Sequence, residues 1–195
     1  MKVLFVSFFI VIADQLSKLF IKGFSIPFLK LNFLGLQPGQ RIPVIDGLFN
    51  ITLVENPGIA FGINFGADFK ILISLFTLMA SVGLLLYLLR NKEKSFGFRL
   101  SLALILGGAV GNLIDRIFYG IIYGYAPLLY GKVVDFFDFR MFNLFIFNKT
   151  FGNYVFNVAD ISVTAGVILL LYVFNKQKST ANNLDSNVEN VLAEK

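Results

Sequence analysis

Two aspartates, Asp135 and Asp160, stand in apolar stretches of a chain that contains no histidine and no cysteine. Without these residue types, a serine-histidine triad, a thiolate nucleophile and a zinc site built from histidine or cysteine are excluded. Carboxylates remain as the obvious catalytic groups. Two carboxylates held close together cannot both ionise cheaply, so one acts as a base while its protonated partner acts as an acid. This chemistry needs neither a metal ion nor another cofactor.

The elements that must position these aspartates are membrane helices. Hydrophobic residues make up 56% of the chain and charged residues only 15%, and the mean hydropathy is +0.75. Four apolar windows each approach the roughly 20 residues that cross a bilayer as a helix; they are residues 3–21, 69–89, 98–119 and 156–174. The sequence therefore predicts an all-α membrane protein with one domain over residues 1–176, followed by a polar, disordered tail over 177–195.

Basic residues set the expected orientation of these helices. They gather around the short link between the second and third windows, before the first window and after the fourth. These residues are Arg90, Lys92, Lys94, Arg99, Lys2, Lys176 and Lys178. Because cytoplasmic loops are rich in lysine and arginine, both termini are expected in the cytoplasm. The net charge of +5 then reports orientation, and no nucleic-acid partner is expected.

Two longer segments must lie on the opposite side of the membrane. The first, residues 22–68, contains a strand-like run at 48–54 and a turn at Asn56-Pro57-Gly58, which predicts a small extracytoplasmic β-lobe between the first two helices. The second, residues 120–155, is rich in tyrosine and phenylalanine. This composition predicts an interfacial segment between the third and fourth helices, lying along the membrane surface.

A set of charged and amide residues within the windows falls in one layer. At about 1.5 Å of rise per residue, the outer ends of three windows carry Asp14, Lys18, Asn112, Asp115, Arg116, Asn157 and Asp160. Asn56 and Asp135 reach the same layer from the neighbouring segments. Ionisable groups inside a membrane are costly unless they are paired or hydrated, so this convergence predicts a functional site near the outer leaflet.

Spacing alone leaves several roles open. Asp14 and Lys18 are four residues apart, which favours an ion pair that braces the site. Asn157 followed three residues later by Asp160 fits a helix N-cap with an acidic first turn as well as it fits catalysis. Asp138 lies three residues after Asp135 and is the alternative reactive carboxylate.

Two other classes of function compete with an enzyme. A small transporter or channel subunit would also carry charged residues in its helices, but it would need a polar route to the cytoplasmic side, where these windows offer almost none. A membrane scaffold subunit would explain the helices and not the one-sided acidic cluster. The sequence favours a hydrolase over both of these hypotheses.

Five short motifs, in order, resemble those of the bacterial lipoprotein signal peptidase family, also called signal peptidase II. They read Asp14-Gln15-Leu16-Ser17-Lys18, Asn56-Pro57-Gly58-Ile59-Ala60-Phe61, Gly111-Asn112-Leu113-Ile114-Asp115-Arg116, Val133-Val134-Asp135-Phe136 and Phe156-Asn157-Val158-Ala159-Asp160. The resemblance implies a four-helix aspartyl endopeptidase of the bacterial inner membrane. Its members remove the signal peptides of prolipoproteins by cutting just before a cysteine that carries a diacylglyceryl group.

Carried over residue by residue, the resemblance implies that Asp135 and Asp160 form the catalytic dyad. It implies substrate-binding or supporting roles for the other matching positions, which are Asn56, Gly58, Asn112, Arg116, Asn157, Asp115, Asp14 and Lys18. Two stretches, residues 121–131 and 141–153, are longer than the family's usual spacing. The expected partners are diacylglyceryl-modified prolipoproteins and membrane lipid, the expected state is a monomer, and no cofactor or metal is expected.

Overall fold

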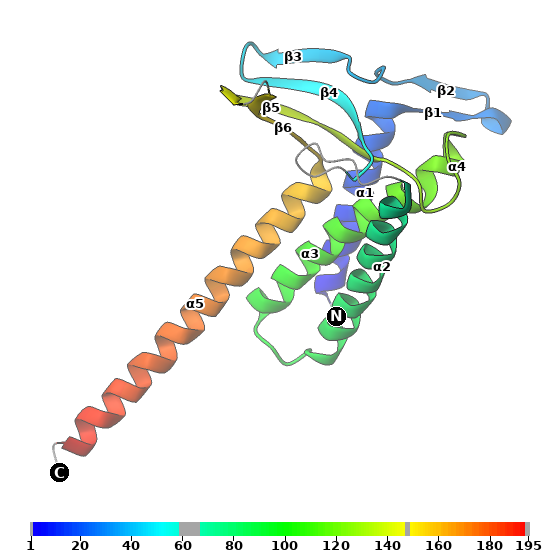
Figure 1. The fold of residues 1–195 in the computed structure, drawn as a ribbon. Coiled ribbons are helices and arrows are strands. Elements are labelled where there is room, and N and C mark those ends of the chain that lie inside the picture. The colour runs from blue at the N-terminus through cyan, green and yellow to red at the C-terminus, as the bar shows by residue number, and fades with distance from the viewer. Residues whose placement is uncertain (1, 59–66, 147–148, 194–195) are drawn as a thin grey trace.

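The computed structural model describes residues 2–58, 67–146 and 149–193. Its long helices are α1 (Val3–Lys22), α2 (Ala67–Arg90), α3 (Phe96–Ile114) and α5 (Val158–Ala193), as Figure 1 shows. Within the described residues, four helical stretches are long and apolar enough to cross a membrane: Val3–Lys22, Lys70–Arg90, Phe96–Ile122 and Val158–Lys178. The four predicted spans are confirmed.

The third span is the centre of the bundle. α3 packs against α1, α2 and α5, and the window around it is 50% buried, compared with 17% for each of the other three. The outer helices therefore turn large apolar side chains such as Phe5, Phe76 and Ile168 outward, which is the arrangement expected where the surrounding solvent is lipid.

Glycines on α3 permit this close packing. A side chain at Gly107 would meet Ser7 and Ile10 of α1, and one at Gly108 would meet the backbone of Ala159 in α5. Small residues at helix contacts allow backbones to approach in a membrane, where burial of apolar area drives little association. The glycine run thus brings α1 and α5 close to α3, and with them the polar residues near their ends.

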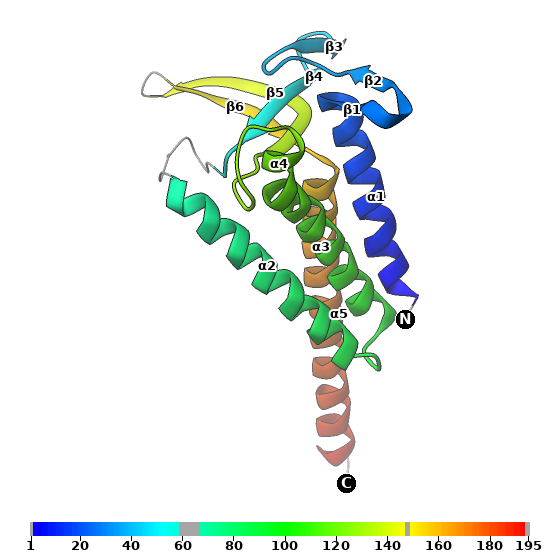
Figure 2. The same cartoon turned by 90° about the vertical axis from the view of Figure 1, so that its right-hand side faces the viewer.

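Two antiparallel sheets lie at one end of the bundle, which we call the sheet end (Figures 1 and 2). β1 (Gly23–Ile26) pairs with β2 (Leu31–Leu34), and a four-stranded sheet has the order β3 (Arg41–Ile45), β4 (Phe49–Asn56), β5 (Val133–Ile146), β6 (Lys149–Phe156). The strand-like run at 48–54 is found as β4. β4 and β5 join segments far apart in the sequence, with Val54 opposite Asp135.

The segment over residues 120–155 contains strands that were not predicted. A short helix α4 (Gly120–Ile122) leads into β5 and β6, which complete the larger sheet; the place of the segment along the membrane surface stays a prediction. The physical reason for the strands is the alternation of apolar and charged residues from Phe137 to Arg140, whose period of two is that of a strand. Aromatic composition alone hides this period.

The polar tail begins as a continuation of α5, which is helical through Ala193. The disorder expected for this tail stays a prediction. Its few large apolar residues are Leu184, Val188, Val191 and Leu192. The last three follow Leu184 by four, seven and eight residues, which is a helical period.

Candidate active site

Polar side chains from α1 and from the turn that continues α3 form a buried cluster at the sheet end, which we call the lysine cluster: Asp14, Gln15, Lys18 and Asp115. The Lys18 ammonium lies 2.8 Å from Asp14 Oδ2 and 2.8 Å from Asp115 Oδ2, and all three side chains are fully buried. It also donates to Asn112 Oδ1 at 2.9 Å. An ammonium has three hydrogens, so each one has an acceptor.

The two carboxylates of this cluster are equally well satisfied. Asp14 Oδ1 accepts the backbone N–H of Ala159 at 2.9 Å, and Asp115 Oδ2 accepts that of Val134 at 3.1 Å. Gln15 Nε2 donates to Asp115 Oδ1 at 2.9 Å, and Tyr119 donates its hydroxyl to Gln15 Oε1 at 3.2 Å. The cluster therefore ties α1 and α3 to the start of β5 and the start of α5.

A second set of carboxylates, Asp135 and Asp160, lies beside the first, and we call it the carboxylate pair. Asp135 comes from β5 and is 4% exposed. Its Oδ1 accepts from Asn157 Nδ2 at 2.7 Å, and its Oδ2 accepts from Asn56 Nδ2 at 3.2 Å. Asn56 ends β4 and is held by an Asx turn, in which its Oδ1 accepts the N–H of Gly58 at 2.9 Å.

Asp160 is positioned by the first turn of α5. Its Oδ2 accepts the N–H of Asn157 at 3.1 Å, while Asn157 Oδ1 accepts the N–H of Asp160 at 3.0 Å. This is a reciprocal capping box. The other carboxylate oxygen, Oδ1, accepts from Asn112 Nδ2 at 2.8 Å. Asp160 therefore caps its helix with one oxygen and presents the other to the site, so the helix cap does not compete with a chemical role.

Neutral amides separate the pair from the lysine cluster. Asn112 accepts from Lys18 and donates to Asp160, and Asn157 donates to Asn112 Oδ1 at 2.9 Å as well as to Asp135. Among the described residues, no lysine or arginine nitrogen lies within 4.0 Å of either carboxylate of the pair. Arg116 is close enough to interact electrostatically with both.

The surroundings of Asp135 change the pKa of its carboxyl group. Burial raises the pKa of Asp135, and the charge of Asp160 raises it further, to about 7, against the opposing hydrogen bonds from Asn56 and Asn157 and the charge of Lys18. A carboxyl with a pKa near 7 exchanges its proton at neutral pH. The arrangement thus supplies one base and one acid within the same site.

An apolar groove opens beside Asp160. Its volume is about 770 Å³, and it lies between the first turns of α5 and the aromatic face of the larger sheet; it is lined by Leu48, Phe139, Tyr154, Phe156, Ile161, Thr164, Ala165 and Ile168, with Asp160. The groove can hold an apolar segment with a polar bond next to the carboxylate.

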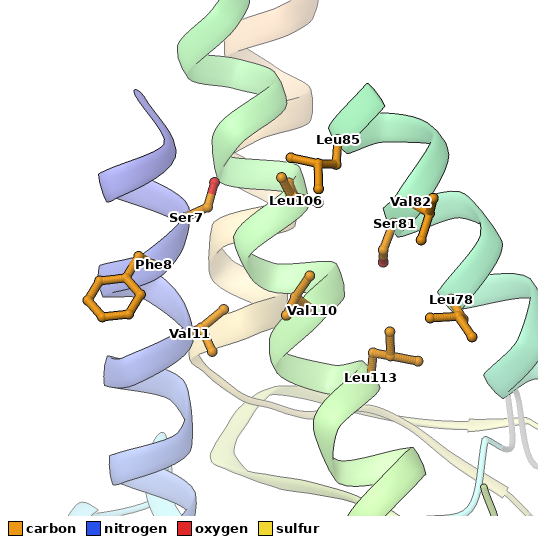
Figure 3. Close-up of a pocket in the computed structure, with 10 residues that line it drawn as sticks. All are labelled: Ser7, Phe8, Val11, Leu78, Ser81, Val82, Leu85, Leu106, Val110 and Leu113. Carbon is orange, nitrogen blue, oxygen red and sulfur yellow. The ribbon is translucent and has the colours of Figure 1, made fainter. Parts of the chain in front are cut away.

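A second cavity does not reach the pair. It has a volume of about 380 Å³ and lies between α1, α2 and α3; Figure 3 shows the residues that line it. It is lined by apolar residues and by Ser7 and Ser81, and no charged side chain lines it. We therefore place the site at the groove.

Comparison with known proteins gives the family. The sequence model described as Signal peptidase (SPase) II matches residues 6–175. The chain belongs to the signal peptidase II family.

Curated relatives in this family match most of the chain. A lipoprotein signal peptidase of Moorella thermoacetica (strain ATCC 39073 / JCM 9320) is 36% identical over 88% of this chain and 91% of its own length. Another, of Clostridioides difficile (strain 630), is 38% identical over 85% of this chain and 90% of its own. The enzyme class expected from the sequence motifs, a signal peptidase II hydrolase, is confirmed, and a transporter or scaffold is not favoured.

Solved structures agree with the fold. A bacterial membrane enzyme structure determined at 2.3 Å by the in meso method has a TM-score of 0.63 and 28% identity, covering 92% of this chain and 90% of the other. A second, at 1.9 Å, has a TM-score of 0.59 and 29% identity, covering 89% and 92%.

Most residues expected from the signal peptidase II motifs come together. Asn56, Asn112, Asn157, Asp135 and Asp160 form one hydrogen-bonded set. The predicted Asp14–Lys18 ion pair is present. Residues 59–61 of the second motif lie outside the described residues.

Asp138 is held differently from Asp135. It is 2% exposed, accepts from Thr52 Oγ1 at 2.9 Å, and lies 3.5 Å from Arg41 Nε and 3.7 Å from Arg140 Nη2. Its charge therefore has counter-ions in the sheet.

Sequence reasoning missed Gln15 and Tyr119 as members of the lysine cluster. It also missed Glu55, which pairs with Lys22 and, at 2.9 Å, with Lys132. These ion pairs outweigh burial and lower the pKa of Glu55. Glu55 precedes Asn56, so this contact fixes the end of β4. Only the position of Gln15 inside the first motif gave a signal.

Proposed function

We propose that this protein removes signal peptides from prolipoproteins and that Asp135 and Asp160 carry out the hydrolysis. The observation that carries the assignment is that, in the described part of the chain, no lysine or arginine nitrogen lies within 4.0 Å of the carboxylate pair, whereas both carboxylates of the neighbouring cluster lie 2.8 Å from Lys18. A buried carboxylate without a cation takes up a proton, and a pair of them provides the acid and base that peptide hydrolysis requires.

The reaction uses both members of the pair. The ionised carboxylate takes a proton from a water molecule that lies between the two, and this water attacks the scissile carbonyl carbon. The protonated partner donates a hydrogen bond to the carbonyl oxygen and stabilises the tetrahedral intermediate. The C–N bond then breaks, and the leaving amine takes the proton that the first carboxylate received from the water. The two carboxyls titrate as a coupled pair, so we assign the proton to neither aspartate alone.

The amides around the pair keep it ready for this step. Asn56 and Asn157 hold the two oxygens of Asp135, and Asn112 holds Asp160. Fixed side chains need no rearrangement during the reaction. Arg116, which lies near both carboxylates, is placed to bind the substrate backbone, and Gly58 keeps the turn after Asn56 at a φ of 92°.

The groove beside Asp160 fits the apolar part of the substrate. A signal peptide and the acyl chains of a diacylglyceryl cysteine are both apolar and both reach into the membrane. We place the cut just before the lipidated cysteine, where the groove meets Asp160. A complete site lies in one chain, because β5 and α5 supply both aspartates, so a monomer suffices.

Cleavage of matched substrates tests this function. Purified protein in detergent is given one prolipoprotein with the diacylglyceryl group and the same prolipoprotein without it, and the new N-terminus is identified by mass spectrometry. We expect a cut just before the cysteine, and only in the modified substrate. A cut elsewhere, or equal cleavage of both, would contradict the proposed substrate.

We also propose that the sheet end faces away from the cytoplasm, in the bacterial inner membrane. The basic link between α2 and α3 supports this orientation. Because the chain has no cysteine, the variants Asp46→Cys and Glu93→Cys each carry one thiol. A membrane-impermeant maleimide added to whole spheroplasts is expected to label the first and spare the second; the reverse result would invert the topology.

A further inference from the structure

The β1–β2 hairpin projects sideways from the sheet end of α1 (Figures 1 and 2). It spans residues 23–34, with a turn of 3₁₀ helix at Pro27–Leu29 between its strands. Gly23 directly follows Lys22, the last residue of a helix that can cross a membrane. The hairpin is therefore tied to the level at which α1 leaves the apolar phase.

The hairpin has two unlike faces. Residues paired across antiparallel strands point to the same side, and successive residues alternate. One face carries the pairs Phe24–Phe33 and Ile26–Leu31, and the other carries Ser25–Asn32 and Gly23–Leu34. The apolar face is open: Phe33 is 42% and Leu31 51% exposed, and Phe28 at the tip is 84% exposed. Contiguous exposed apolar side chains of this kind mark an interaction surface.

Ring contacts show which way the apolar face points. The Phe33 ring stacks on Phe24 at 5.8 Å between centroids and meets Phe20 edge to face at 5.6 Å. Phe20 lies in the last turn of α1 and is itself 57% exposed. The apolar face therefore turns back along α1 and continues the outward-facing surface of a membrane-spanning helix.

The base of the hairpin is fixed, so this direction is set by the fold. Gly23 has a φ of 82°, and its backbone lies so close to Gly35 that a side chain at either position would collide with the other. The N–H of Leu36 donates to the carbonyl of Ile21 at 2.8 Å, and Tyr123 donates its hydroxyl to the carbonyl of Gly23 at 2.8 Å.

We infer that the β1–β2 hairpin is a membrane-interface anchor whose partner is the lipid bilayer. Its apolar face lies among the acyl chains, and the face with Ser25 and Asn32 remains in water. Lys30 at the tip extends its ammonium to the lipid phosphates, as long basic side chains do at interfaces. The occupant is the bilayer, because the contact of Phe33 with the exposed Phe20 joins the apolar face to the outer surface of α1, a helix that can cross a membrane. The anchor would fix the depth of the sheet, and with it that of Asp135.

Tryptophan fluorescence tests this inference, because the native chain contains no tryptophan. Leu31→Trp and Leu34→Trp place one indole on each face of the same strand, at sites that are 51% and 85% exposed. Phe9→Trp, at a 64% exposed site in the middle of α1, is the control for a lipid position. Each variant is reconstituted in phospholipid vesicles with and without bromine on the acyl chains.

We expect brominated lipid to quench the Leu31→Trp variant about as strongly as Phe9→Trp, and aqueous acrylamide to quench mainly Leu34→Trp. Acrylamide quenching of both hairpin variants, with no effect of bromine, would overturn the anchor. Equal lipid quenching of both would overturn the two-faced placement. Shielding of Leu31→Trp that grows with the protein-to-lipid ratio would assign the face to a second copy of the chain instead.

Discussion

The lysine cluster and the carboxylate pair are neighbours, yet their buried carboxylates have different kinds of partner. In the first, two carboxylates share one lysine, and each hydrogen of the ammonium has an acceptor. In the second, the two carboxylates accept hydrogen bonds, among the described residues, from neutral amides and a backbone N–H. Burial and the charge of Asp160 raise the pKa of Asp135 to about 7.

Under the proposed function, this difference separates a bracing cluster from a reactive pair without reference to position in the sequence. All four aspartates lie at the sheet end, and three of them are nearly or fully buried. Burial therefore does not identify the reactive ones. The partner distinguishes them: a nearby lysine favours the charged form of a carboxylate, whereas burial among neutral amides favours the protonated form.

The largest effect is expected from removing the brace. Lys18→Met leaves Asp14 and Asp115 buried without a cation, and breaking a buried ion pair on one side costs about 3–5 kcal/mol. This is a large part of the stability of an ordinary domain. We expect a much lower unfolding temperature in detergent, whereas Lys30→Met at the exposed hairpin tip leaves it unchanged. A Lys18→Met variant as stable as the native chain would contradict the brace.

The next effect concerns Asn112, which links the two sets. Asn112→Asp retains an oxygen for Lys18 and loses the donor to Asp160, so the protein should fold while the pair is misplaced and more negative. Poor placement of reacting groups can cost about 100-fold in rate. We expect kcat to fall by that order with a native circular dichroism spectrum. Near-native kcat in this variant would show that Asp160 does not depend on Asn112.

A smaller effect is the pH dependence of stability. The pKa of Asp135 is raised from 3.8 to about 7, so the folded state binds more protons than the unfolded state between these values. Stability due to this group therefore falls as pH rises through this range, by up to about 4 kcal/mol. Asp135→Asn should flatten that slope in unfolding experiments between pH 4 and 8. An unchanged slope would place the raised pKa elsewhere.

The sequence predicted the helices and the candidate site better than the sheet. Apolar windows report membrane spans directly, because length and composition decide them. Asp160 stood out because so few charged residues enter those windows, and Asp135 because it stands in an apolar stretch of the segment before the fourth window. The strands β5 and β6 were missed because their aromatic residues masked a period of two, and β4 and β5 pair across more than 70 residues of chain.

The roles of individual polar residues were harder to predict. Asp14 and Lys18 follow a helical spacing that indicates an ion pair, but Asp115 completes it from another helix, which no local pattern reveals. Likewise, Asp135 and Asp138 stand three residues apart on one strand, and only their partners distinguish them. Three-dimensional contacts, more than residue type, decide which carboxylate keeps its charge.

The most direct test of the account is cleavage of a diacylglyceryl-modified prolipoprotein by four folded proteins: the native chain, Asp135→Asn, Asp160→Asn and Asp138→Asn. Asp138 is the matched control, because it is also buried on β5 but has arginines as partners. We predict that the first two variants lose about 10³-fold or more in kcat, while Asp138→Asn retains a rate near that of the native chain. Near-native cleavage by either Asp135→Asn or Asp160→Asn would contradict the central claim.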